Sequence, residues 1–375
     1  MDSTSGDTEA STSTAVDGLN TIIVIGGEGF LGHCLLRDLY KRYGTSVKLY
    51  SSSRTRRYHE EHWDWIQTDI TSRTSIDSVL STTGAKTVFL AATSHFDSEK
   101  AAAWKVNVRG TEAVVEACLA AGVRRLIFTS STSAIFSGKN VINADEDYPT
   151  VSEDDAKSVY GASKAAGERI VMQANGKNGM YTCAIRPASF TGPGDTTVIP
   201  QGLAVMKQGQ AVFQVGDNSA LCDWDHVDNV THGHILAYEK LLSPSDPSQP
   251  GPAAGQIFNI TGCEPWPLWD YFQRMWYEYN GYKQPFKIVI PYWLAYAIAV
   301  VIAFFQDLLG LKKGGFTPHT VIYATAWRTH NCDKAKRLLG YEPVISTEEG
   351  LVQSVKWYKE EEQRLLQEKQ AAKGK

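Results

Sequence analysis

The chain has 375 residues, a formal net charge of −4, 43% hydrophobic residues and 21% charged residues. This composition is ordinary for a soluble globular protein that buries a large core in one or two domains. It argues against nucleic acid as the main ligand, because the chain has no dominant basic field. The six cysteines include no CxxC pair, so we expect free thiols in a reducing compartment and no metal cluster.

From residue 21 onward, short apolar runs alternate with segments of helical period. The preceding residues, 1–20, are rich in Ser, Thr, Asp and Gly and lack the apolar run of a signal peptide, so we expect a disordered tail there. Strands are expected at 21–25, 46–50, 65–70, 86–92, 125–130 and 182–186, and helices at 29–43, 101–121 and 158–173. This alternation predicts an α/β fold of Rossmann type, a doubly wound parallel sheet that binds ligands at the carboxyl ends of its strands.

After residue 186 the alternation becomes irregular. We therefore predict a Rossmann domain at 21–186, a smaller C-terminal substrate-binding part at 187–358 and a charged tail at 359–375. Some later segments are predicted to return to the first domain. A further strand is expected at 256–260, after a loop rich in Pro, Ser and Gly.

A glycine-rich turn joins the first expected strand to the first expected helix in the sequence TIIVIGGEGFLG, residues 21–32. Gly26 permits the tight turn, Gly29 lets the backbone approach a phosphate, and Gly32 lets the helix pack close to the strand. The N–H groups and the dipole at the start of the helix favour negative charge. The motif therefore predicts a dinucleotide site, and a turn that binds no ligand is the alternative.

The residues after the second expected strand bear on the choice between NAD and NADP. A dinucleotide site usually has an acidic residue there for the adenosine ribose, whereas this chain has Ser51, followed by Arg54. An acid would repel a 2′-phosphate, and a serine with an arginine could hold one, so we favour NADP over NAD. Asp69, at the end of the third expected strand, is a candidate for the adenine edge, with a helix N-cap as its alternative role.

Tyr160 and Lys164 in the sequence YGASK lie four residues apart, on one face of an expected helix. A phenol is a poor acid–base catalyst at neutral pH, and a fixed cation lowers its pKa. We predict that Tyr160 exchanges a proton with the substrate oxygen, that Lys164 binds the nicotinamide ribose and lowers the phenol pKa, and that Ser131 hydrogen-bonds the same oxygen. Thr132 and Ser133 are rivals to Ser131, and an amphipathic helix surface is the alternative interpretation of the tyrosine–lysine pair.

An uncharged apolar stretch at 288–306 bears on where the protein resides. Pro291 interrupts it and leaves roughly 14 clean residues, fewer than the ~20 that a spanning helix needs. We expect a monotopic helix on a membrane surface within 288–309, and keep a buried or oligomer-facing helix and a true span as alternatives.

Two histidines and three aspartates in the second half could suggest further chemistry. His232 and His234 are two residues apart, which does not place them on one face of a helix, so we interpret them as core or surface histidines and predict no metal. Asp223, Asp225 and Asp228 form no convincing carboxylate pair, and we expect them to make structural hydrogen bonds.

Taken in order, the motifs of this chain resemble those of the extended short-chain dehydrogenases. They are GGEGFLG, TDIT at 68–71, VFLAA at 88–92, NVRGT at 107–111, TSSTS at 129–133, YGASK, IRPASFTGPGD at 185–195 and DKAKRLLGYEP at 333–343. The segments VGDNSALCDWDHVDNVTHGHILA at 215–237 and FNITGCEPWPLWDYF at 258–272 resemble the 3β-hydroxysteroid dehydrogenase branch. Within that branch they look most like the sterol-4α-carboxylate 3-dehydrogenases (decarboxylating).

This resemblance implies a set of site residues and two departures. The implied catalytic residues are Ser131, Tyr160 and Lys164. The implied cofactor set comprises Gly26, Gly29, Phe30, Leu31, Asp69, the loop around Ala91, and Pro187. The residues themselves add Ser51 and Arg54 at the adenosine end and Tyr160 and Lys164 at the nicotinamide end. Ser51 stands where the branch commonly has Asp, and Leu90 stands where a histidine is common, which could reshape the nicotinamide side. The apolar stretch resembles the membrane-associating region of the branch.

The implied activity is NAD(P)-dependent oxidation of a 3β-hydroxyl on a sterol or related terpenoid, with decarboxylation if C4 carries a carboxylate. The implied setting is the endoplasmic reticulum membrane, peripheral or monotopic, with the catalytic domain in the cytosol, a lipid substrate, and a homodimer or a sterol-pathway complex. The alternatives are an NADPH-dependent ketone reductase with a non-steroid substrate, a nucleotide-sugar epimerase or dehydratase, and a non-enzymatic cofactor sensor. The apolar stretch counts against the epimerase, and the intact catalytic set counts against the sensor.

Overall fold

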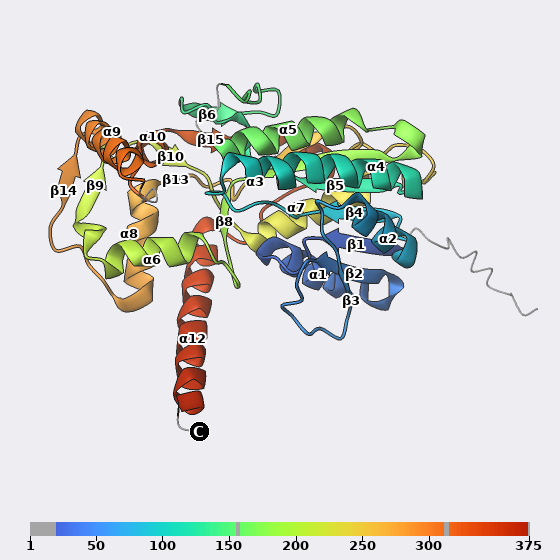
Figure 1. The fold of residues 1–375 in the computed structure, drawn as a ribbon, viewed down its shortest axis with the longest axis horizontal. Coiled ribbons are helices and arrows are strands. Elements are labelled where there is room, and N and C mark those ends of the chain that lie inside the picture. Colours follow the sequence, from blue (N-terminus) through green and yellow to red (C-terminus); the bar gives the residue numbers. More distant parts are fainter. Residues whose placement is uncertain (1–19, 155–157, 311–314, 374–375) are drawn as a thin grey trace, which may run out of the picture.

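The centre of the molecule is a seven-stranded parallel sheet (Figure 1). The computed structural model describes residues 20–154, 158–310 and 315–373, so the tail predicted at 1–20 lies outside it except for Asn20. The strands run in the order β12-β7-β5-β4-β1-β2-β3. They are β1 (Thr21–Ile25), β2 (Lys48–Ser53), β3 (Asp64–Gln67), β4 (Thr87–Leu90), β5 (Arg125–Thr129), β7 (Tyr181–Pro187) and β12 (Ile257–Ile260).

Two layers of helices cover the sheet, one on each face. One face carries α1 (Phe30–Tyr43), α7 (Val227–Lys240) and α11 (Asp333–Leu339), and the other carries α2 (Arg73–Thr83), α4 (Thr111–Ala121) and α5 (Val159–Gln173). In β1, Ile22 and Val24 belong to the first core, whereas Ile23 and Ile25 belong to the second. A strand covered on both faces needs a continuous apolar run, which this segment provides. The predicted doubly wound parallel sheet of Rossmann type is confirmed.

The second strand differs from its prediction in a way that matters for the site. It was expected at 46–50, but β2 begins at Lys48 and extends to Ser53. Ser51 pairs with Val24 of β1 and with Trp65 of β3. It is therefore a fully buried strand residue and does not belong to the loop that follows.

The helix expected at 101–121 is interrupted. It consists of α3 (Lys100–Trp104), a π-helical turn η2 (Lys105–Gly110) and α4. The π-turn contains the buried side chain of Asn107, whose hydrogen bonds lead away from the helix toward the loop after β4. Such π-bulges occur mostly inside α-helices and frequently at functional sites.

The second part of the chain is built from short strands and helices. A four-stranded sheet has the order β13-β10-β15-β6, and two strand pairs, β11 with β8 and β14 with β9, lie beside it. These strands are β6 (Val141–Ala144), β8 (Ser189–Thr191), β9 (Phe213–Val215), β10 (Leu221–Cys222), β11 (Trp224–His226), β13 (Trp266–Pro267), β14 (Ile288–Ile290) and β15 (Arg328–His330). The helices are α6 (Val198–Lys207), α8 (Leu268–Asn280), α9 (Tyr292–Leu308), α10 (Pro318–Thr325) and α12 (Thr347–Lys373), and the 3₁₀ turns of the chain are η1 (Gly44–Ser46), η3 (Thr132–Ile135), η4 (Lys177–Gly179) and η5 (Gln210–Val212).

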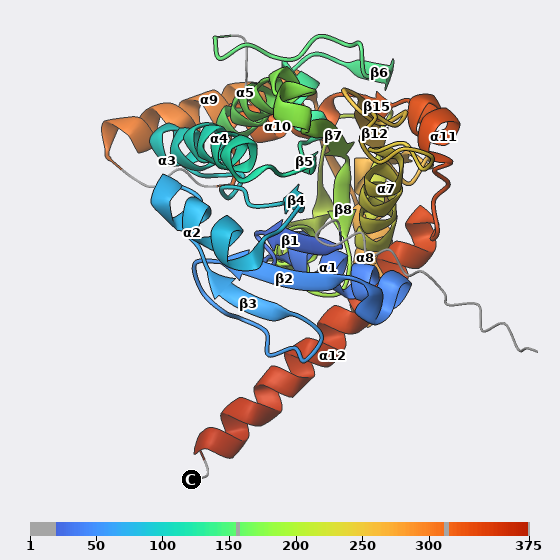
Figure 2. The ribbon, with the colours of Figure 1, turned by 90° about the vertical axis from the view of Figure 1, so that its right-hand side faces the viewer.

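The two parts exchange segments along the chain. The segments α7, β12 and α11 pack against or pair with the Rossmann sheet, while β6 leaves it to pair with β15. The charged tail predicted at 359–375 is not a separate segment, because α12 continues as one helix to Lys373. Figure 2 shows this helix projecting from the body of the molecule. Residues 374–375 lie outside the described part.

Most side chains of α9 are apolar and exposed. Of its residues, Ala295 and Ala299 are the buried ones, whereas Trp293 is 68% exposed and Phe304 is 62% exposed. The first three residues of the predicted apolar segment form β14, which pairs with β9, so the helix begins at Tyr292. Within the described residues, no helix is long and apolar enough to cross a membrane.

Candidate active site

The glycine-rich turn lies between β1 and α1, at the carboxyl edge of the sheet. Gly26 has a φ of +95°, and a Cβ there would lie 2.5 Å from the backbone nitrogen of Ala92. A Cβ on Gly32 would lie 2.1 Å from the carbonyl oxygen of Gly26. The turn and the start of the helix therefore require glycine at both positions.

The first turn of α1 is open to an anion. Gly29 is its N-cap, no side chain caps the helix, and the first turn contains no acidic residue. N–H groups at a helix start lack partners within the helix and favour phosphate. The N–H groups of Phe30 and Leu31 thus fit the pyrophosphate of a dinucleotide, whereas that of Gly29 donates to the Gly26 carbonyl at 3.0 Å and closes the turn. The Phe30 ring stacks on Phe190, with 5.5 Å between ring centres, and this contact supports the turn from the second part of the chain.

A carboxylate from the same turn lies at the adenosine end of the site. The Ser51 hydroxyl donates to Oε1 of Glu28 at 2.6 Å. Oε2 of Glu28 accepts from the backbone N–H groups of Arg57 at 2.6 Å and Tyr58 at 2.9 Å. Glu28 was missed in the sequence, where an acid was sought only at the end of the second strand. The signal that could have found it is the acidic residue inside the glycine-rich motif.

Arg54 and Asp69 lie at the same edge of the sheet. Arg54 is exposed directly after β2, and its carbonyl accepts from Nε2 of Gln67. Asp69 is half-buried, and hydrogen bonds from the backbone N–H and the hydroxyl of Thr71 lower the pKa of its carboxyl group. The N-cap of α2 is Ser72, so the alternative role of Asp69 as that cap is excluded.

The phenol of Tyr160 meets two hydroxyl groups. Tyr160 lies in the first turn of α5, and Thr93 and Ser131 both hydrogen-bond its side chain. Burial raises the pKa of Tyr160, and these two hydrogen bonds partly offset the rise. Of the serines and threonines in TSSTS, Ser131 is thus the one that contacts the phenol, and its rivals Thr132 and Ser133 do not. Thr93, which follows β4, was missed in the sequence.

Lys164 is buried one helical turn after Tyr160. Its Nζ donates to the carbonyl of Thr129 at 2.5 Å and lies 4.4 Å from the ring centre of Phe128. Burial lowers the pKa of Lys164 to about 7, and the nearby Glu168 opposes that shift. The predicted lowering of the Tyr160 pKa by this lysine is not met in this structure, because Thr129 engages the ammonium and burial dominates at the phenol.

Asn107 ties α5 to the loop after β4. Its Oδ1 accepts from the backbone N–H of Ser94 at 2.8 Å and from the hydroxyl of Thr93 at 3.1 Å. Its Nδ2 donates to the Ser163 hydroxyl on α5 at 2.9 Å. The sequence motif NVRGT pointed to this segment, but its role as a link became visible only in the fold.

Ala91 and Pro187 lie at the carboxyl edge of the sheet, and their role in binding the cofactor stays a prediction. Pro187 is the last residue of β7 and Ala91 directly follows β4, so they flank the end of β5 at the carboxyl edge. Leu90 does not border the site. Its side chain is fully buried in the core under α2 and α4, so the predicted effect of this residue on the nicotinamide side is wrong.

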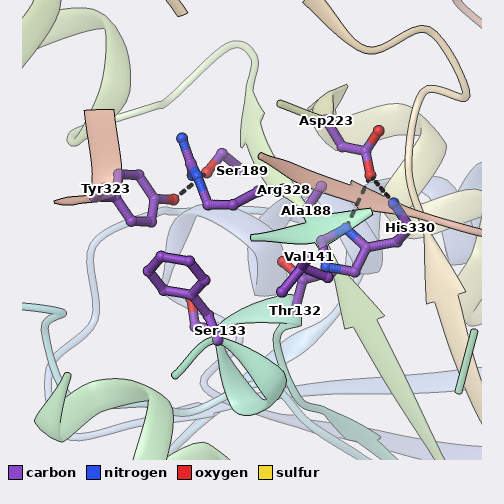
Figure 3. A pocket seen from close by; sticks show the side chains of 10 residues that line it. Thr132, Ser133, Val141, Ala188, Ser189, Asp223, Tyr323, Arg328 and His330 are labelled. Carbon is purple, nitrogen blue, oxygen red and sulfur yellow. Dashed lines mark hydrogen bonds and ion pairs between the residues drawn. The ribbon is translucent and has the colours of Figure 1, made fainter. Parts of the chain in front are cut away.

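A narrow cavity lies next to the segment that follows Ser131, on the side of the second part of the chain (Figure 3). Its lining comes from η3, β6, β8, α10 and β15. The lining residues are Thr132, Ser133, Phe136, Val141, Ala188, Ser189, Asp223, Tyr323, Arg328 and His330. Figure 3 shows Arg328 between a Tyr323–Ser189 pair and an Asp223–His330 pair.

The histidines and aspartates of the second half have structural partners. Nδ1 of His234 donates to the Val230 carbonyl at 2.7 Å, so its Nε2 accepts from the Thr129 hydroxyl at 2.8 Å. Burial lowers the pKa of His234 to about 4, which keeps the ring neutral. Asp225 accepts from Nδ2 of Asn229 at 2.8 Å. These contacts agree with the structural roles predicted from the sequence.

The family model described as "3-beta hydroxysteroid dehydrogenase/isomerase family" matches residues 23–292. The chain belongs to this family. It is 32% identical over 355 residues to a decarboxylating sterol-4-alpha-carboxylate 3-dehydrogenase of Candida albicans, with 92% of this chain and 99% of that protein covered. It is 33% identical to the protein of the same name from Mus musculus, with 88% and 89% covered. The predicted resemblance, and with it the class of nicotinamide-dependent oxidoreductases, is confirmed.

Solved structures of the same fold include sugar-nucleotide enzymes. The UDP-glucose 4-epimerase of Thermotoga maritima superposes with a TM-score of 0.68 at 21% identity, over 91% of this chain and 99% of that one. At this identity the likeness supports the fold and not the substrate.

The depressed pKa of Lys164 leads to a prediction for stability. We expect Lys164→Met to raise the melting temperature of the cofactor-free protein, because it removes a buried ammonium whose pKa is about 7 instead of 10.5. The sign follows from linkage: the unfolded chain binds this proton more strongly, so the destabilisation is fully present below pH ~7 and disappears as the pH rises through ~10.5. Calorimetry near pH ~6 and pH ~9.5 should therefore show a larger gain at the lower pH. The exposed Lys177→Met is the control, and a melting temperature that falls at low pH would contradict the prediction.

Proposed function

We propose that this protein oxidises the 3β-hydroxyl of a sterol 4α-carboxylate, or of a terpenoid with the same arrangement, and that the product then loses CO₂. The observation that carries the proposal is the phenol of Tyr160 hydrogen-bonded to Ser131 at the carboxyl edge of a dinucleotide-binding sheet. The names of the relatives from Candida albicans and Mus musculus support the substrate class.

The side chains divide the work of proton transfer. Tyr160, once deprotonated, accepts the proton of the substrate hydroxyl, while Ser131 holds the oxygen in place. A bound nicotinamide supplies the acceptor for the hydride that leaves C3. Because burial raises the pKa of Tyr160, the rate of oxidation is expected to increase as the pH rises toward that pKa.

Decarboxylation needs no further catalytic residue. Oxidation leaves a ketone on the carbon next to the one that bears the carboxylate. The bond between C4 and the carboxyl carbon then breaks, its electron pair enters an enolate, CO₂ leaves, and C4 takes a proton from solvent. The protein has only to bind a carboxylate and an apolar ring system next to Tyr160.

The choice between the two cofactors depends on Glu28. The sequence favoured NADP because Ser51 replaces an acid and Arg54 lies nearby. Glu28 supplies a carboxylate at the same place, 2.6 Å from the Ser51 hydroxyl, and a negative charge there repels a 2′-phosphate. Since Glu28 is buried and Arg54 is exposed to solvent, the repulsion is screened less than the attraction. We therefore propose NAD(H) as the preferred cofactor.

The exposed apolar face of α9 suits a membrane surface. The helix presents Trp293, Val301 and Phe304 to the outside, and the lysines Lys283 and Lys287 lie exposed in the segment just before it. Apolar side chains flanked by basic residues are typical of interfacial helices. We propose that α9 lies in one leaflet, on the cytosolic side of the endoplasmic reticulum. A homodimer or a sterol-pathway complex stays a prediction.

The second candidate is an NADPH-dependent ketone reductase, because the contacts of Tyr160 and Ser131 serve either direction of hydride transfer. A sugar-nucleotide epimerase is less compatible with the exposed apolar α9. A cofactor sensor does not need a phenol held by two hydroxyl groups.

Substitution of Tyr160 tests the proposed reaction. We expect the wild-type protein, supplied with NAD and a 4α-carboxy-3β-hydroxysterol, to form NADH and CO₂ in equal amounts. Tyr160→Phe should retain NADH binding and lose roughly 10²–10⁴-fold in turnover, because general acid–base catalysis typically contributes that much. The exposed Tyr277→Phe on α8 is the control. A wild-type protein that reduces ketones with NADPH and leaves the sterol untouched would favour the second candidate.

Substitution of Glu28 tests the cofactor preference. Fluorescence titration of the wild-type protein should give a lower Kd for NADH than for NADPH. Glu28→Gln should reduce the ratio of the Kd for NADPH to the Kd for NADH roughly tenfold, because the charge that repels the 2′-phosphate is removed. A tenfold change corresponds to about 1.4 kcal/mol. Glu61→Gln, an exposed acid in the following loop, should leave the ratio unchanged. Tighter binding of NADPH by the wild-type protein would instead assign the choice to Ser51 and Arg54.

Substitution of α9 tests the membrane surface. The wild-type protein should float with phosphatidylcholine vesicles in a density gradient, and the triple variant Trp293→Ser, Val301→Ser, Phe304→Ser should stay at the bottom. Val344→Ser, which replaces an exposed apolar residue elsewhere, should float. Equal flotation of wild type and triple variant would contradict the proposal.

A further inference from the structure

The cavity beside the catalytic serine contains a buried cation. Arg328, the first residue of β15, is only 8% exposed. Its Nη2 donates to Sγ of Cys222 at 2.9 Å, and its Cζ lies 3.4 Å from the ring centre of Tyr323. Its Nε is buried and has no hydrogen-bond partner among the described residues. The guanidinium is thus held firmly on two sides and retains a free donor.

No carboxylate of the described residues is paired with this arginine. Asp223 lines the same cavity, but its Oδ2 accepts from the backbone N–H of His330 at 2.7 Å and from Nδ1 of His330 at 2.9 Å. The fully buried Arg186, in contrast, has two hydrogen bonds to Glu168, at 2.6 and 2.8 Å. A buried charge without a partner costs free energy, and a bound anion at Arg328 would recover it.

The position of Arg328 relative to the catalytic residues matches the proposed substrate. Thr132 and Ser133, which directly follow Ser131, line the same cavity as Arg328 (Figure 3). A carboxylate on the carbon next to the reacting carbon lies close to the reacting oxygen. When that oxygen meets Tyr160 and Ser131, the carboxylate is therefore brought to the mouth of this cavity.

We propose that Arg328 is the residue that binds the 4-carboxylate of the substrate. The inference rests on the function proposed above and adds the residue that recognises the acid. The planar guanidinium matches a carboxylate, and stacking on Tyr323 fixes its orientation before the substrate arrives. Arg328 thus selects 3-hydroxy acids over plain 3β-hydroxysterols, and it positions the substrate without taking part in proton transfer.

The test crosses a protein variant with a substrate variant. Wild-type protein and Arg328→Met are each assayed on a 4α-carboxy-3β-hydroxysterol and on its methyl ester, with NADH formation as the readout. We expect Arg328→Met to raise KM for the acid roughly 10- to 100-fold and to leave KM for the ester nearly unchanged. The preference of the wild-type protein for the acid should therefore disappear in the variant, which a general loss of stability would not produce.

Controls separate recognition from folding. Arg125→Met removes an arginine that also stacks on a tyrosine, Tyr238, but lies at the opposite end of β5 from the site, and it should keep the wild-type preference. Arg328→Lys retains the charge without the planar fork and should show an intermediate preference. NADH titration verifies that each variant is folded. If Arg328→Met does not bind NADH, the role of Arg328 is decided by comparing the KM values of Arg328→Lys for the acid and for the ester.

The outcomes also separate this inference from the proposed function. If the wild-type protein oxidises neither the acid nor the ester, the proposed function fails. If it oxidises the acid and the preference over the ester is the same in Arg328→Met and Arg328→Lys as in the wild type, the proposed function stands and the role of Arg328 is overturned.

Discussion

The close approach of α5 to two backbone turns fixes the catalytic geometry. A Cβ on Gly161 would lie 2.5 Å from the carbonyl oxygen of Ser133, and a Cβ on Gly167 would lie 2.6 Å from the carbonyl oxygen of Asn107. Both obstacles are backbone atoms, so neither can move aside without moving its turn. With glycine at both positions, the helix brings Tyr160 beside Ser131 and buries Lys164 against β5. These two contacts therefore set the position of Tyr160 and Lys164 relative to η3 and to the π-turn.

Features set by neighbours in the sequence were predictable. The buried run of β1, the glycine turn and the spacing of Tyr160 and Lys164 are local patterns, and each appears where it was expected. Features set by tertiary contacts were not. Pairing with β1 and β3 extends β2 through Ser51, and the burial of Leu90 depends on helices packed over it. The sequence also predicted that Lys164 lowers the pKa of Tyr160. That prediction failed because a spacing of four residues does not show that both groups are buried.

The second part of the chain was hardest to predict for a physical reason. Its strands have two to four residues, too few to show a period of two, and their partners are distant in sequence: β15 pairs with β6 and with β10. That pairing is what carries Arg328 to the segment after the catalytic serine. In the sequence the arginine is one basic residue among many, since nothing local reveals that it is buried without a carboxylate. Glu28 is visible inside the glycine-rich motif, but its hydrogen-bond partners, Ser51 on β2 and Arg57 and Tyr58 in the loop after β2, are not.

Side chains of α10 line two hollows. The inner cavity contains Tyr323 and Arg328, whereas an outer hollow is lined by Ile322 and Thr325 of the same helix and by Tyr292 at the start of α9. A sterol carboxylate carries its hydroxyl and its charge at one end and is apolar along the rest. Were the charged end to face α9, an ion would enter the apolar surface, whereas the reverse orientation pairs it with a buried cation. A substrate that arrives from a membrane at α9 would therefore direct its carboxylate inward to Arg328, which brings C3 to Tyr160. The difference in polarity between the two ends of the substrate thus determines which carbon reacts.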